Sequence, residues 1–482
     1  MQIKIVSLMV AAVLTGCSMA PDYQRPEAPT TAGWTGVDKA SDQTVLPDWK
    51  TFMADERLQT LVEMALKNNK DLRQTILNVA SLRAQYKIQD SDRYPGLDAS
   101  GTVTNQRYSN NYTGQGTSYN HYKTATVGVS SYELDLFGRV KSLSDEALES
   151  YLSEDETRRS AVISLIAEVA TSYMSLLADQ ELLALTNDTV DAYEETLKLV
   201  QTRYDAGYSD ALTLAQSKTA LYSAQATAAQ YRLSVAQEYN TLRQLVGAPI
   251  DKSYLGKLPE EEGKFLSELK VGASSDLLLA RPDILAAEHT LRASNANIGA
   301  ARAAFFPTIS LTAGYGSASQ SLDNLFSGGS QYWSFIPSIT VPIFDWGNNS
   351  ANLDLAKIEK QSSVIAYQQA IETAFKEVSD ALLGQKHYLE EWDAQKANLQ
   401  ANEQYYDLAK MRYEKGNDSY IDLLDAQRSL FSARESELTS HLSLLTSRIN
   451  LYKALGGGWT AADNEQSTSV SNAIDEMDNS EE

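Results

Sequence analysis

The side chains that most often carry catalysis or metal binding are few and scattered in this sequence. The four histidines are His121, His289, His387 and His441, and none of them forms the HExxH spacing of a zinc hydrolase. The single cysteine excludes a disulfide framework and a cluster of thiolates around a metal. Neither a GxxxxGK[ST] phosphate loop nor a GxSxG nucleophile turn occurs, and no GxGxxG follows a predicted strand. We therefore expect no enzyme, no metal site and no dissociable cofactor.

The one cysteine stands where covalent attachment of lipid is expected. Residues 1–16 have the features of a secretory signal, because Lys4 gives a positive end and residues 5–14 form an apolar stretch too short to span a bilayer. The stretch closes with Leu14-Thr15-Gly16-Cys17, which resembles a bacterial lipobox, whose cysteine is lipidated and becomes the new N-terminus. Ser18 follows, whereas Asp is the usual inner-membrane retention signal, so we expect outer-membrane sorting. An ordinary signal with an incidental cysteine is the alternative.

The charge balance excludes one class of partner. The 482 residues include 63 acids and 41 bases, which gives a net charge of −22. We expect no nucleic-acid partner, because phosphate binding needs a basic face. No segment after Cys17 has about eighteen uninterrupted apolar residues, so no transmembrane helix is expected there. Residues 459–482 contain acids and no base, and we interpret them as an acidic, flexible tail.

An internal duplication organises the rest of the chain. Several motifs recur in the same order about 210 residues apart, which indicates two copies of one structural unit. The pairs at an offset of 209 residues are Gly138 and Gly347, Arg203-Tyr204-x-x-Gly207 and Arg412-Tyr413-x-x-Gly416, and Gly247 and Gly456.

Each copy contains a long segment without helix breakers. Residues 139–206 hold neither Gly nor Pro, and residues 348–415 are interrupted only by Gly384. A second such arm follows Gly207 and Gly416, with Asp210 or Asp418 near its start. The apolar residues step by 4 and 3, as in helices that pack on helices. An example is the run Val162, Ile166, Val169, Tyr173 and Leu176. Each copy is therefore predicted to be a long helical hairpin whose tip is closed by a glycine.

The segment before each long helix has the composition and alternation of a strand–loop–strand unit. Residues 95–137 are rich in Thr, Ser and Tyr and alternate at Ala125, Val127 and Val129. Residues 307–346 repeat the plan, with Trp333, Phe335 and Ile339 nearly all on one face. The sequence thus predicts four strands per chain, with apolar residues that suit the wall of a lipid-facing barrel.

Four strands cannot close a barrel alone. An open sheet in lipid would leave edge N–H and C=O groups unpaired, at several kcal/mol each, and the smallest single-chain barrels need about eight strands. A membrane sheet therefore requires oligomers, with eight strands from two subunits or twelve from three. Two soluble hairpins packed on the helices are the alternative.

At this point the motifs support a family resemblance. From Cys17 to about Trp459 the chain resembles the TolC-family outer-membrane factors, in the OprM-like lipoprotein branch of tripartite RND-type efflux pumps. The motifs are Tyr132-Glu-Leu-Asp-Leu-Phe-Gly-Arg139, Ser275-Asp-Leu-Leu-Leu-Ala-Arg-Pro-Asp-Ile284, Phe306-Pro-Thr-Ile-Ser-Leu-Thr312, Val341-Pro-Ile-Phe-Asp-Trp-Gly347, Tyr420-Ile-Asp-Leu-Leu-Asp-Ala-Gln427 and Leu451-Tyr-Lys-Ala-Leu-Gly-Gly-Gly-Trp459.

The resemblance implies a mainly α fold with a membrane β-barrel. It implies a homotrimer with a twelve-stranded barrel in the outer membrane and a twelve-helix tunnel in the periplasm. The implied partners are outer-membrane lipid, a periplasmic membrane-fusion adaptor and, through the adaptor, an inner-membrane RND transporter. The implied function is a passive exit duct for drugs or other small toxic compounds.

The expected domain division follows the repeats. After the signal at 1–16 come a lipidated, extended arm at 17–54, repeat 1 at 55–247, an equatorial linker at 248–274, repeat 2 at 275–458 and the tail at 459–482. Repeat 1 would hold strands at about 95–135 and a hairpin at 138–246 with its tip near 207. Repeat 2 would hold strands at about 307–345 and a hairpin at 347–455 with its tip near 416.

The resemblance also implies a gate at the periplasmic tip. Ile421 matches an apolar gate position, where Leu is more frequent in the family, Asp425 matches an acidic one, and Tyr413 matches an aromatic near the same aperture. Ile421 and Asp425 are four residues apart and so share a helix face. The plainer alternatives are a packing residue for Ile421 and a solvated helix charge for Asp425.

The hairpin tips are candidate elements for docking the adaptor. The tip residues are Arg203, Tyr204, Gly207, Arg412, Tyr413 and Gly416. Turn geometry with local ion pairs is the alternative interpretation of these residues. The acidic charge could favour cationic solutes in a lumen, or it could simply solvate the exterior.

Three other functions remain open at the level of sequence. A type I protein-secretion duct and a metal-ion efflux duct could share this fold, although no cluster of soft-metal ligands is present. A soluble coiled-coil scaffold lipoprotein is a rival from another class. The exported compounds and the identities of the adaptor and transporter cannot be inferred from these residues.

Overall fold

The computed structural model describes residues 18–29, 46–108, 118–251, 254–258, 265–267, 269 and 275–458. The predicted signal at 1–16, Cys17 and the tail at 459–482 lie outside these residues. The chain forms two compact units that each draw on both sequence copies. The sheet unit takes the described residues within 1–27, 77–156 and 285–369, and the hairpin unit takes those within 28–76, 157–284 and 370–482.

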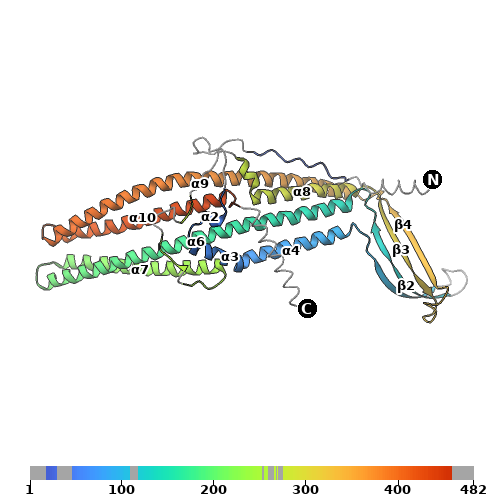
Figure 1. The fold of residues 1–482 in the computed structure, drawn as a ribbon, viewed down its shortest axis with the longest axis horizontal. Coiled ribbons are helices and arrows are strands. Elements are labelled where there is room, and N and C mark those ends of the chain that lie inside the picture. The colour runs from blue at the N-terminus through green and yellow to red at the C-terminus, as the bar shows by residue number, and fades with distance from the viewer. Residues whose placement is uncertain are drawn as a thin grey trace. The chain divides into compact units, whose positions relative to one another are not determined.

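Four long helices form in the predicted segments, which lack Pro and contain a single Gly, Gly384. They are α6 (Arg139–Asp205), α7 (Ala211–Val246), α9 (Asn348–Glu414) and α10 (Tyr420–Ala454). In the hairpin unit, the α6–α7 and α9–α10 pairs lie side by side with their turns at the same end (Figure 1). One 18-residue stretch of α6 is apolar enough to cross a membrane, but 67% of it is buried, as expected for a core helix.

Both hairpin tips use the same glycine-closed turn. Gly207 and Gly416 adopt φ of +77° and +76°, a left-handed conformation that glycine takes without a Cβ penalty. The N–H of Tyr208 donates to the carbonyl of Arg203 at 2.8 Å, and the N–H of Asn417 donates to that of Arg412 at 2.9 Å. Each glycine N–H also donates to the carbonyl three residues before it at 3.0 Å, so both tips are Schellman motifs and are closed in the same way.

The next helices begin with different caps. Asp210 accepts a hydrogen bond from the N–H of Thr213 at 2.7 Å and caps α7, as expected for a residue near its start. In the second copy Ser419, not Asp418, is the cap, and it forms a reciprocal capping box with Asp422. Asp418 is instead paired with Arg412 across the turn.

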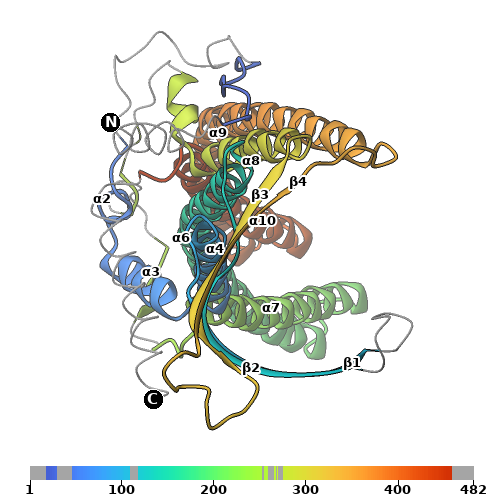
Figure 2. The ribbon, with the colours of Figure 1, turned by 90° about the vertical axis from the view of Figure 1, so that its right-hand side faces the viewer.

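The sheet unit contains one antiparallel sheet in the order β1-β2-β3-β4 (Figure 2). Its strands are β1 (Asp98–Tyr108), β2 (Ser118–Glu133), β3 (Thr308–Ser319) and β4 (Gln331–Thr340). Four strands are therefore confirmed, and β2 of the first copy pairs with β3 of the second. The strand expected to run to about 345 ends at Thr340, shortly before Pro342, which has no N–H for a ladder.

Strand register separates the sheet into an apolar and a polar face. Ala99, Val127, Tyr315 and Trp333 stand side by side in one row across all four strands. We call the face that contains this row the apolar face. Its apolar residues also include Val103, Ala125, Val129, Ile309, Leu311, Ala313, Phe335 and Ile339. The polar face carries mainly Ser, Thr and Gly: Ser100, Thr102, Thr126, Gly128, Thr312, Gly314, Gly316, Ser334 and Ser338.

Glycines make the polar face the crowded side of the sheet. A Cβ on Gly128 would lie 2.7 Å from the Cα of Gly314, and a Cβ on Gly316 would lie 2.7 Å from the Cα of Thr126. Residues without side chains at these positions allow the strands to approach and bend towards this face. A bulge between Val129 and Tyr132, with Ser131 at a φ of 54°, adds to the bend. The polar face is therefore concave.

The same unit holds the N-terminal segment against α8 (Pro282–Ala303). The side chain of Asn295 donates to the carbonyl of Pro21 at 2.8 Å, and that of Arg302 donates to the carbonyl of Met19 at 3.0 Å. Gly299 admits Ala20, because a Cβ there would lie 2.8 Å from the Ala20 nitrogen. The N-terminal segment therefore runs antiparallel to α8, and its residues nearest position 18 contact the end of α8 that leads into β3.

The hairpin unit has its main apolar core around α3 (Glu56–Asn68). Helices α2 (Trp49–Phe52) and α3 pack with the middle of α6, the end of α7 and the end of α10. Phe52 stacks on Tyr452 with ring centroids 4.2 Å apart, and Met53 bridges to Leu266 in the predicted linker. This unit also contains the 3-10 helix η3 (Ser275–Ala280), whereas α4 (Lys70–Ser91) contributes to both units.

Candidate functional site

The two hairpin tips are joined by a contact between Arg203 and Tyr413. The Arg203 guanidinium donates to the Tyr413 phenol at 3.1 Å and lies 5.1 Å from its ring centroid. Only 7% of Tyr413 is exposed, and it packs near Tyr420 with centroids 6.1 Å apart. Both belong to an apolar cluster between the hairpins that includes Tyr193, Val200, Leu221 and Leu424. Of the predicted gate residues, Tyr413 therefore lies between the two hairpins of its own chain.

Ile421 and Asp425 lie together on the exposed side of α10. Ile421 is 54% exposed. Every residue of α10 is described, and Ile421 is the one large apolar side chain of this helix with such exposure. Asp425, one turn later, accepts a hydrogen bond from the Tyr405 phenol of α9 at 3.0 Å. That bond raises the pKa of Tyr405 and holds the carboxylate on the α9 side of the hairpin.

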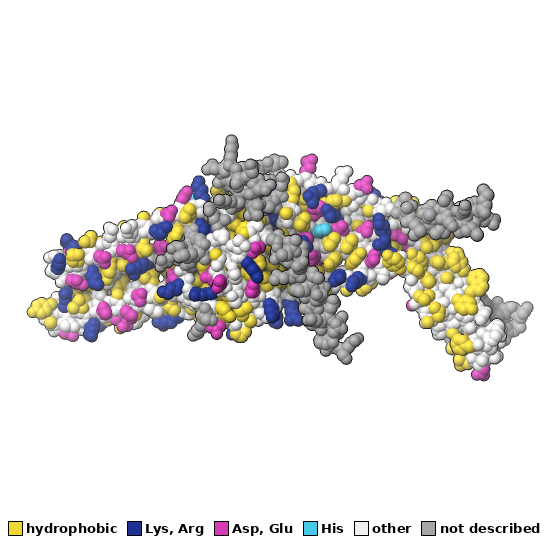
Figure 3. Space-filling model, in the orientation of Figure 1, with side chains coloured by type: hydrophobic (Ala, Val, Ile, Leu, Met, Phe, Trp, Pro, Cys, Tyr) yellow, Lys and Arg dark blue, Asp and Glu magenta, His cyan; other side chains and the backbone are white. Residues whose placement is uncertain are grey.

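The tips present different surfaces to solvent. The first tip exposes Tyr204, Tyr208 and Leu212, with Tyr208 86% exposed, and yellow side chains gather at this end in Figure 3. At the second tip Arg412 donates to both carboxylate oxygens of Asp418 at 2.6 and 2.8 Å, which lowers the pKa of Asp418. The predicted docking residues Arg203 and Arg412 thus have separate partners, one across hairpins and one within its hairpin.

An ion cluster in the sheet unit holds the segment that follows Cys17. Glu288, with a side chain 3% exposed, accepts from Arg25 at 2.5 and 3.1 Å, from Arg292 at 2.7 Å and from the Tyr23 phenol at 3.2 Å. Burial acts to raise the pKa of Glu288, but the hydrogen bonds from Arg25 and Arg292 outweigh it and the pKa is lowered. The cluster therefore favours the ionised carboxylate and fixes the segment on α8.

The buried histidine of α10 has no visible chemical role. His441 stacks on Trp392 of α9 at 4.4 Å, and the Trp392 indole donates to Glu437 at 2.7 Å. The His441 Nε2 atom is buried without a hydrogen-bond partner. Burial and the nearby Lys396 and Arg448 lower the His441 pKa to about 4, so the ring is neutral at neutral pH.

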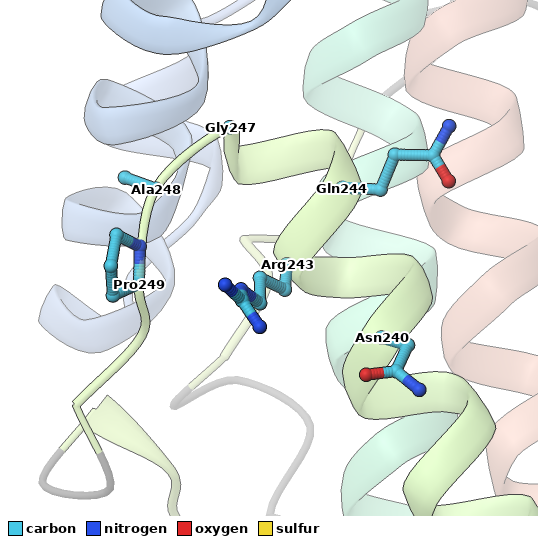
Figure 4. A pocket seen from close by; sticks show the side chains of 6 residues that line it. All are labelled: Asn240, Arg243, Gln244, Gly247, Ala248 and Pro249. Carbon is cyan, nitrogen blue, oxygen red and sulfur yellow. The ribbon is translucent and has the colours of Figure 1, made fainter.

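Two surface hollows lie in the hairpin unit, and one of about 580 Å³ between α9 and α10 is lined by Glu377, Asp380 and Lys453 among others. Another, of about 390 Å³, lies at the end of α7 and is lined by Asn240, Arg243, Gln244, Gly247, Ala248 and Pro249 (Figure 4). Its one charged group, Arg243, points into the space between α7 and the following loop (Figure 4). Among the described residues, no three His, Cys, Asp or Glu side chains are arranged to hold a metal ion.

Sequence reasoning missed the partners of the gate and tip residues. Tyr405 and Asp425 stand ten residues before and after Lys415, and Arg412 and Asp418 stand three before and after it. In an antiparallel hairpin, residues equidistant from the turn face each other, so this symmetry could have identified both pairs. The Arg203–Tyr413 contact joins different hairpins and carries no such signal.

Comparison with known proteins agrees with this architecture. The model of the family described as "Outer membrane efflux protein" matches residues 61–248 and 273–457, which cover both copies. The chain is 47% identical over 465 residues to the "Antibiotic efflux pump outer membrane protein ArpC" of Pseudomonas putida, with 95% of this chain and 96% of the relative covered.

Two further similarities point the same way. The "Toluene efflux pump outer membrane protein TtgC" of Pseudomonas putida is 46% identical over 465 residues, with the same shares covered. The crystal structure of the open state of the Neisseria gonorrhoeae MtrE outer membrane channel superposes with a TM-score of 0.82 at 37% identity, covering 92% of this chain and 98% of that one. The chain therefore belongs to the outer membrane efflux protein family, and it is the outer-membrane channel component of an efflux pump with its helices in the periplasm.

Proposed function

We propose that three copies of this chain form a passive exit duct for small toxic compounds, among them antibiotics and aromatic solvents. The substrate classes are those in the names of the relatives at 46–47% identity. The duct carries out no catalytic step and needs no dissociable cofactor. The energy for export comes from an inner-membrane RND transporter, which a periplasmic adaptor couples to the hairpin tips.

The observation that carries this proposal is the sheet with two unlike faces and two unpaired edges. β1 and β4 are the outer strands in each protomer, and their free N–H and C=O groups would cost several kcal/mol each in lipid. Pairing β4 of one copy with β1 of the next removes every edge. The concave polar face then lines a lumen, and the apolar face meets lipid. Three copies give the twelve strands that the family resemblance implies.

The exposed pair on α10 fits a gate at the periplasmic end. Three Ile421 side chains around the axis would form an apolar ring, and three Asp425 carboxylates would form an acidic ring one turn away. The exposure of Ile421 and its position one turn from Asp425 on the same face of α10 support this role. The Arg203–Tyr413 contact ties the second hairpin to the first and so favours the closed arrangement.

The N-terminal segment supports lipid attachment at Cys17. Residues 25, 21 and 19 contact positions 288, 295 and 302 of α8 in turn, and β3 begins at Thr308. Cys17 comes two residues before Met19 in the sequence. A lipid on that cysteine would therefore be attached close to the base of the sheet, at the periplasmic leaflet.

The mass of the purified protein and its ion conductance test this proposal. The detergent-extracted protein is expected to have the mass of a trimer and to conduct ions in planar bilayers. A lone protomer without current would overturn the proposal. In cells that lack the gene, the protein with its adaptor and transporter should restore tolerance to antibiotics and toluene. Restoration of only protein secretion or only metal tolerance would point to the rival ducts.

Neighbouring residues on β4 supply a matched pair of variants. Phe335 pairs with Ala313 on the apolar face, and Ser334 pairs with Gly314 on the polar face. Phe335→Arg is expected to lower the yield of membrane-inserted trimer, because Arg on a lipid face costs about 2–4 kcal/mol near the midplane. Ser334→Arg should insert normally and alter conductance. Equal insertion of both variants would contradict the assignment of faces.

A further inference from the structure

The charged residues of the four strands are sorted by position. The strands carry two acids, Asp98 and Glu133, at the ends that join the helices. At the opposite, loop end of the sheet stand Arg107, His121 and Lys123, and β3 and β4 carry no charged residue. The described loop between β3 and β4 adds one acid, Asp323, four residues after β3 ends. A chain with a net charge of −22 thus places only basic side chains at the loop end of its strands.

Register puts these side chains on the apolar face. Lys123 pairs with Val103 and Ser319, His121 pairs with Asn105, and Arg107 pairs with Tyr119. They continue the alternation of Val127 and Ala125 on β2 and of Ala99 and Val103 on β1. Side chains two residues apart on a strand point to the same side. The Arg107 and Lys123 side chains and the His121 ring therefore face outwards, in the direction of the lipid-facing residues, and not into the lumen.

The contacts of these three side chains leave their donor groups accessible. The Arg107 guanidinium lies 5.9 Å from the Tyr119 ring centroid, and Tyr119 stacks on His121 at 6.2 Å with 3° between the planes. His121 Nδ1 is 2.7 Å from the side-chain oxygen of Asn105. Lys123 Nζ donates to the backbone oxygen of Gln320 at 3.4 Å. Arg107 and His121 are exposed, and the described strands place no carboxylate beside them.

The height of this row matches a headgroup layer. A strand rises about 3.3 Å per residue and tilts by about 40° in outer-membrane barrels, so each residue advances about 2.5 Å along the membrane normal. On β1, Asn105 and Arg107 are two and four residues beyond Val103, which places His121, the partner of Asn105, and Arg107 about 5 and 10 Å past the last aliphatic residue of that strand. Lys123 lies level with its partner Val103, and its long side chain can extend towards the same layer. Polar headgroups occupy that depth.

We propose that Arg107, Lys123 and His121 bind the phosphate groups of phosphorylated lipids in the outer leaflet. The proposal rests on the proposed function, because it requires the sheet to be a barrel wall with its loop end outside. An Arg fork and a Lys ammonium are the donors that phosphate oxygens favour. Trimerisation repeats the site three times around the wall, where it anchors the barrel to the rigid outer leaflet.

The test measures lipid retention by the purified trimer. Bisphosphorylated lipid A is added to the protein in neutral detergent, and bound lipid is counted by native mass spectrometry. Arg107→Gln with Lys123→Gln is expected to lower the affinity about 30-fold, since each Lys or Arg near an anionic surface contributes about fivefold. Lys123→Gln alone should lower it about fivefold, and Arg107→Lys with Lys123→Arg should retain most of it.

Controls separate the site from net charge and from the function itself. Lys218→Gln with Arg232→Gln removes two exposed cations from α7 and should leave lipid retention unchanged. Equal retention in the strand variant and the native protein would overturn the proposal, as would an equal loss in the α7 control. Displacement of the lipid by millimolar inorganic phosphate would also overturn it, because the site would then read free phosphate. All variants should conduct ions as the native protein does, because the lipid site lies outside the lumen. A native protein that carries no current would refute the proposed duct, whereas the lipid measurement tests only this site.

Discussion

The guanidinium of Arg203 donates to the phenol of Tyr413, 3.1 Å away, and so links the last turn of α6 in one hairpin to the last turn of α9 in the other. The same guanidinium lies 5.1 Å from the ring centroid, so a hydrogen bond and a cation–π contact act together. With Tyr413 mostly buried, the pair contributes about 1–2 kcal/mol. This link is a polar contact between the two tips.

Breaking that link should favour the open state of the tip. Arg203→Ala removes both interactions, whereas Tyr413→Phe removes the hydrogen bond and keeps the ring. We expect a higher single-channel conductance in planar bilayers for Arg203→Ala and a smaller increase for Tyr413→Phe. Arg412→Gln breaks only the exposed pair with Asp418 and should leave conductance unchanged. Unaltered conductance in all three variants would show that the link does not restrain the tip.

The exposed pair on α10 should control leakage through the closed channel. Ile421→Ala and Asp425→Ala together remove both proposed rings and are expected to raise closed-state conductance more than either change alone. Stability should change little, because both side chains are exposed. Tyr405→Phe is the control, since it removes the hydrogen bond to Asp425 but leaves its charge. A closed-state current equal to that of the native protein would assign Ile421 and Asp425 to ordinary surface positions.

The glycines at helix ends should differ in what they tolerate. Gly207→Ala meets no atom within 4 Å, so its cost of about 1 kcal/mol comes only from the positive φ. Gly247→Ala also has a positive φ, and its Cβ would lie 2.5 Å from the carbonyl oxygen of Asn68. We expect a loss of several kcal/mol there, as for other strained and overpacked positions. Urea midpoints would compare the two variants, and equal midpoints would argue against close packing of α7 on α3.

The buried histidine should make stability depend on pH. His441 has a pKa of about 4 in the folded chain, against about 6.5 when unfolded, so the unfolded state binds more protons between these values. The free energy of unfolding is therefore independent of His441 above about pH 6.5, and it falls by about 3 kcal/mol as the pH drops from there towards 4. His441→Phe keeps a ring against Trp392 and should flatten this slope. Melting temperatures from pH 4 to 7 would measure it, and parallel curves would refute the assignment.

The clamp at Glu288 should hold the N-terminal segment. Its pKa is lowered, so the ionised clamp is at full strength above about pH 4.5 and weakens as pH falls through the folded pKa. Glu288→Gln keeps the shape but loses the charge, and should make the segment around Arg25 accessible to trypsin at neutral pH. Lys376→Gln, which breaks an exposed pair with Asp380, is the control. Equal cleavage rates in the two variants would show that other contacts hold the segment.

Local rules predicted the helices and strands well. Helices α6 and α9 follow from long stretches without Pro, interrupted by no glycine in α6 and only by Gly384 in α9. Gly207 and Gly416 close the two hairpin tips because glycine takes a positive φ freely. Alternation at Val127 and Val129 identified a strand because side chains on strands have a period of two. These signals lie within a few residues of one another, so a linear pattern is sufficient.

Contacts between distant segments could not be read in this way. Arg203 and Tyr413 are separated by 210 residues, and Arg25 and Glu288 by 263. Nothing in either local sequence selects its partner, because the pairing depends on how whole helices pack. Assignment of the gate to Ile421 and Asp425 likewise came from family resemblance, and their role remains a prediction. The Cys17 prediction falls outside the described residues and also awaits its test.

The open outer strands β1 and β4 have a consequence for biogenesis. Until sister chains arrive, each newly exported polypeptide displays two templates onto which any extended peptide could add. The apolar face of the sheet is also exposed to water at this stage, so aggregation competes with delivery to the outer membrane. We therefore expect that chaperones bind the chain in the periplasm. Overproduction of the chain without extra chaperone should give insoluble aggregates in place of membrane-inserted protein.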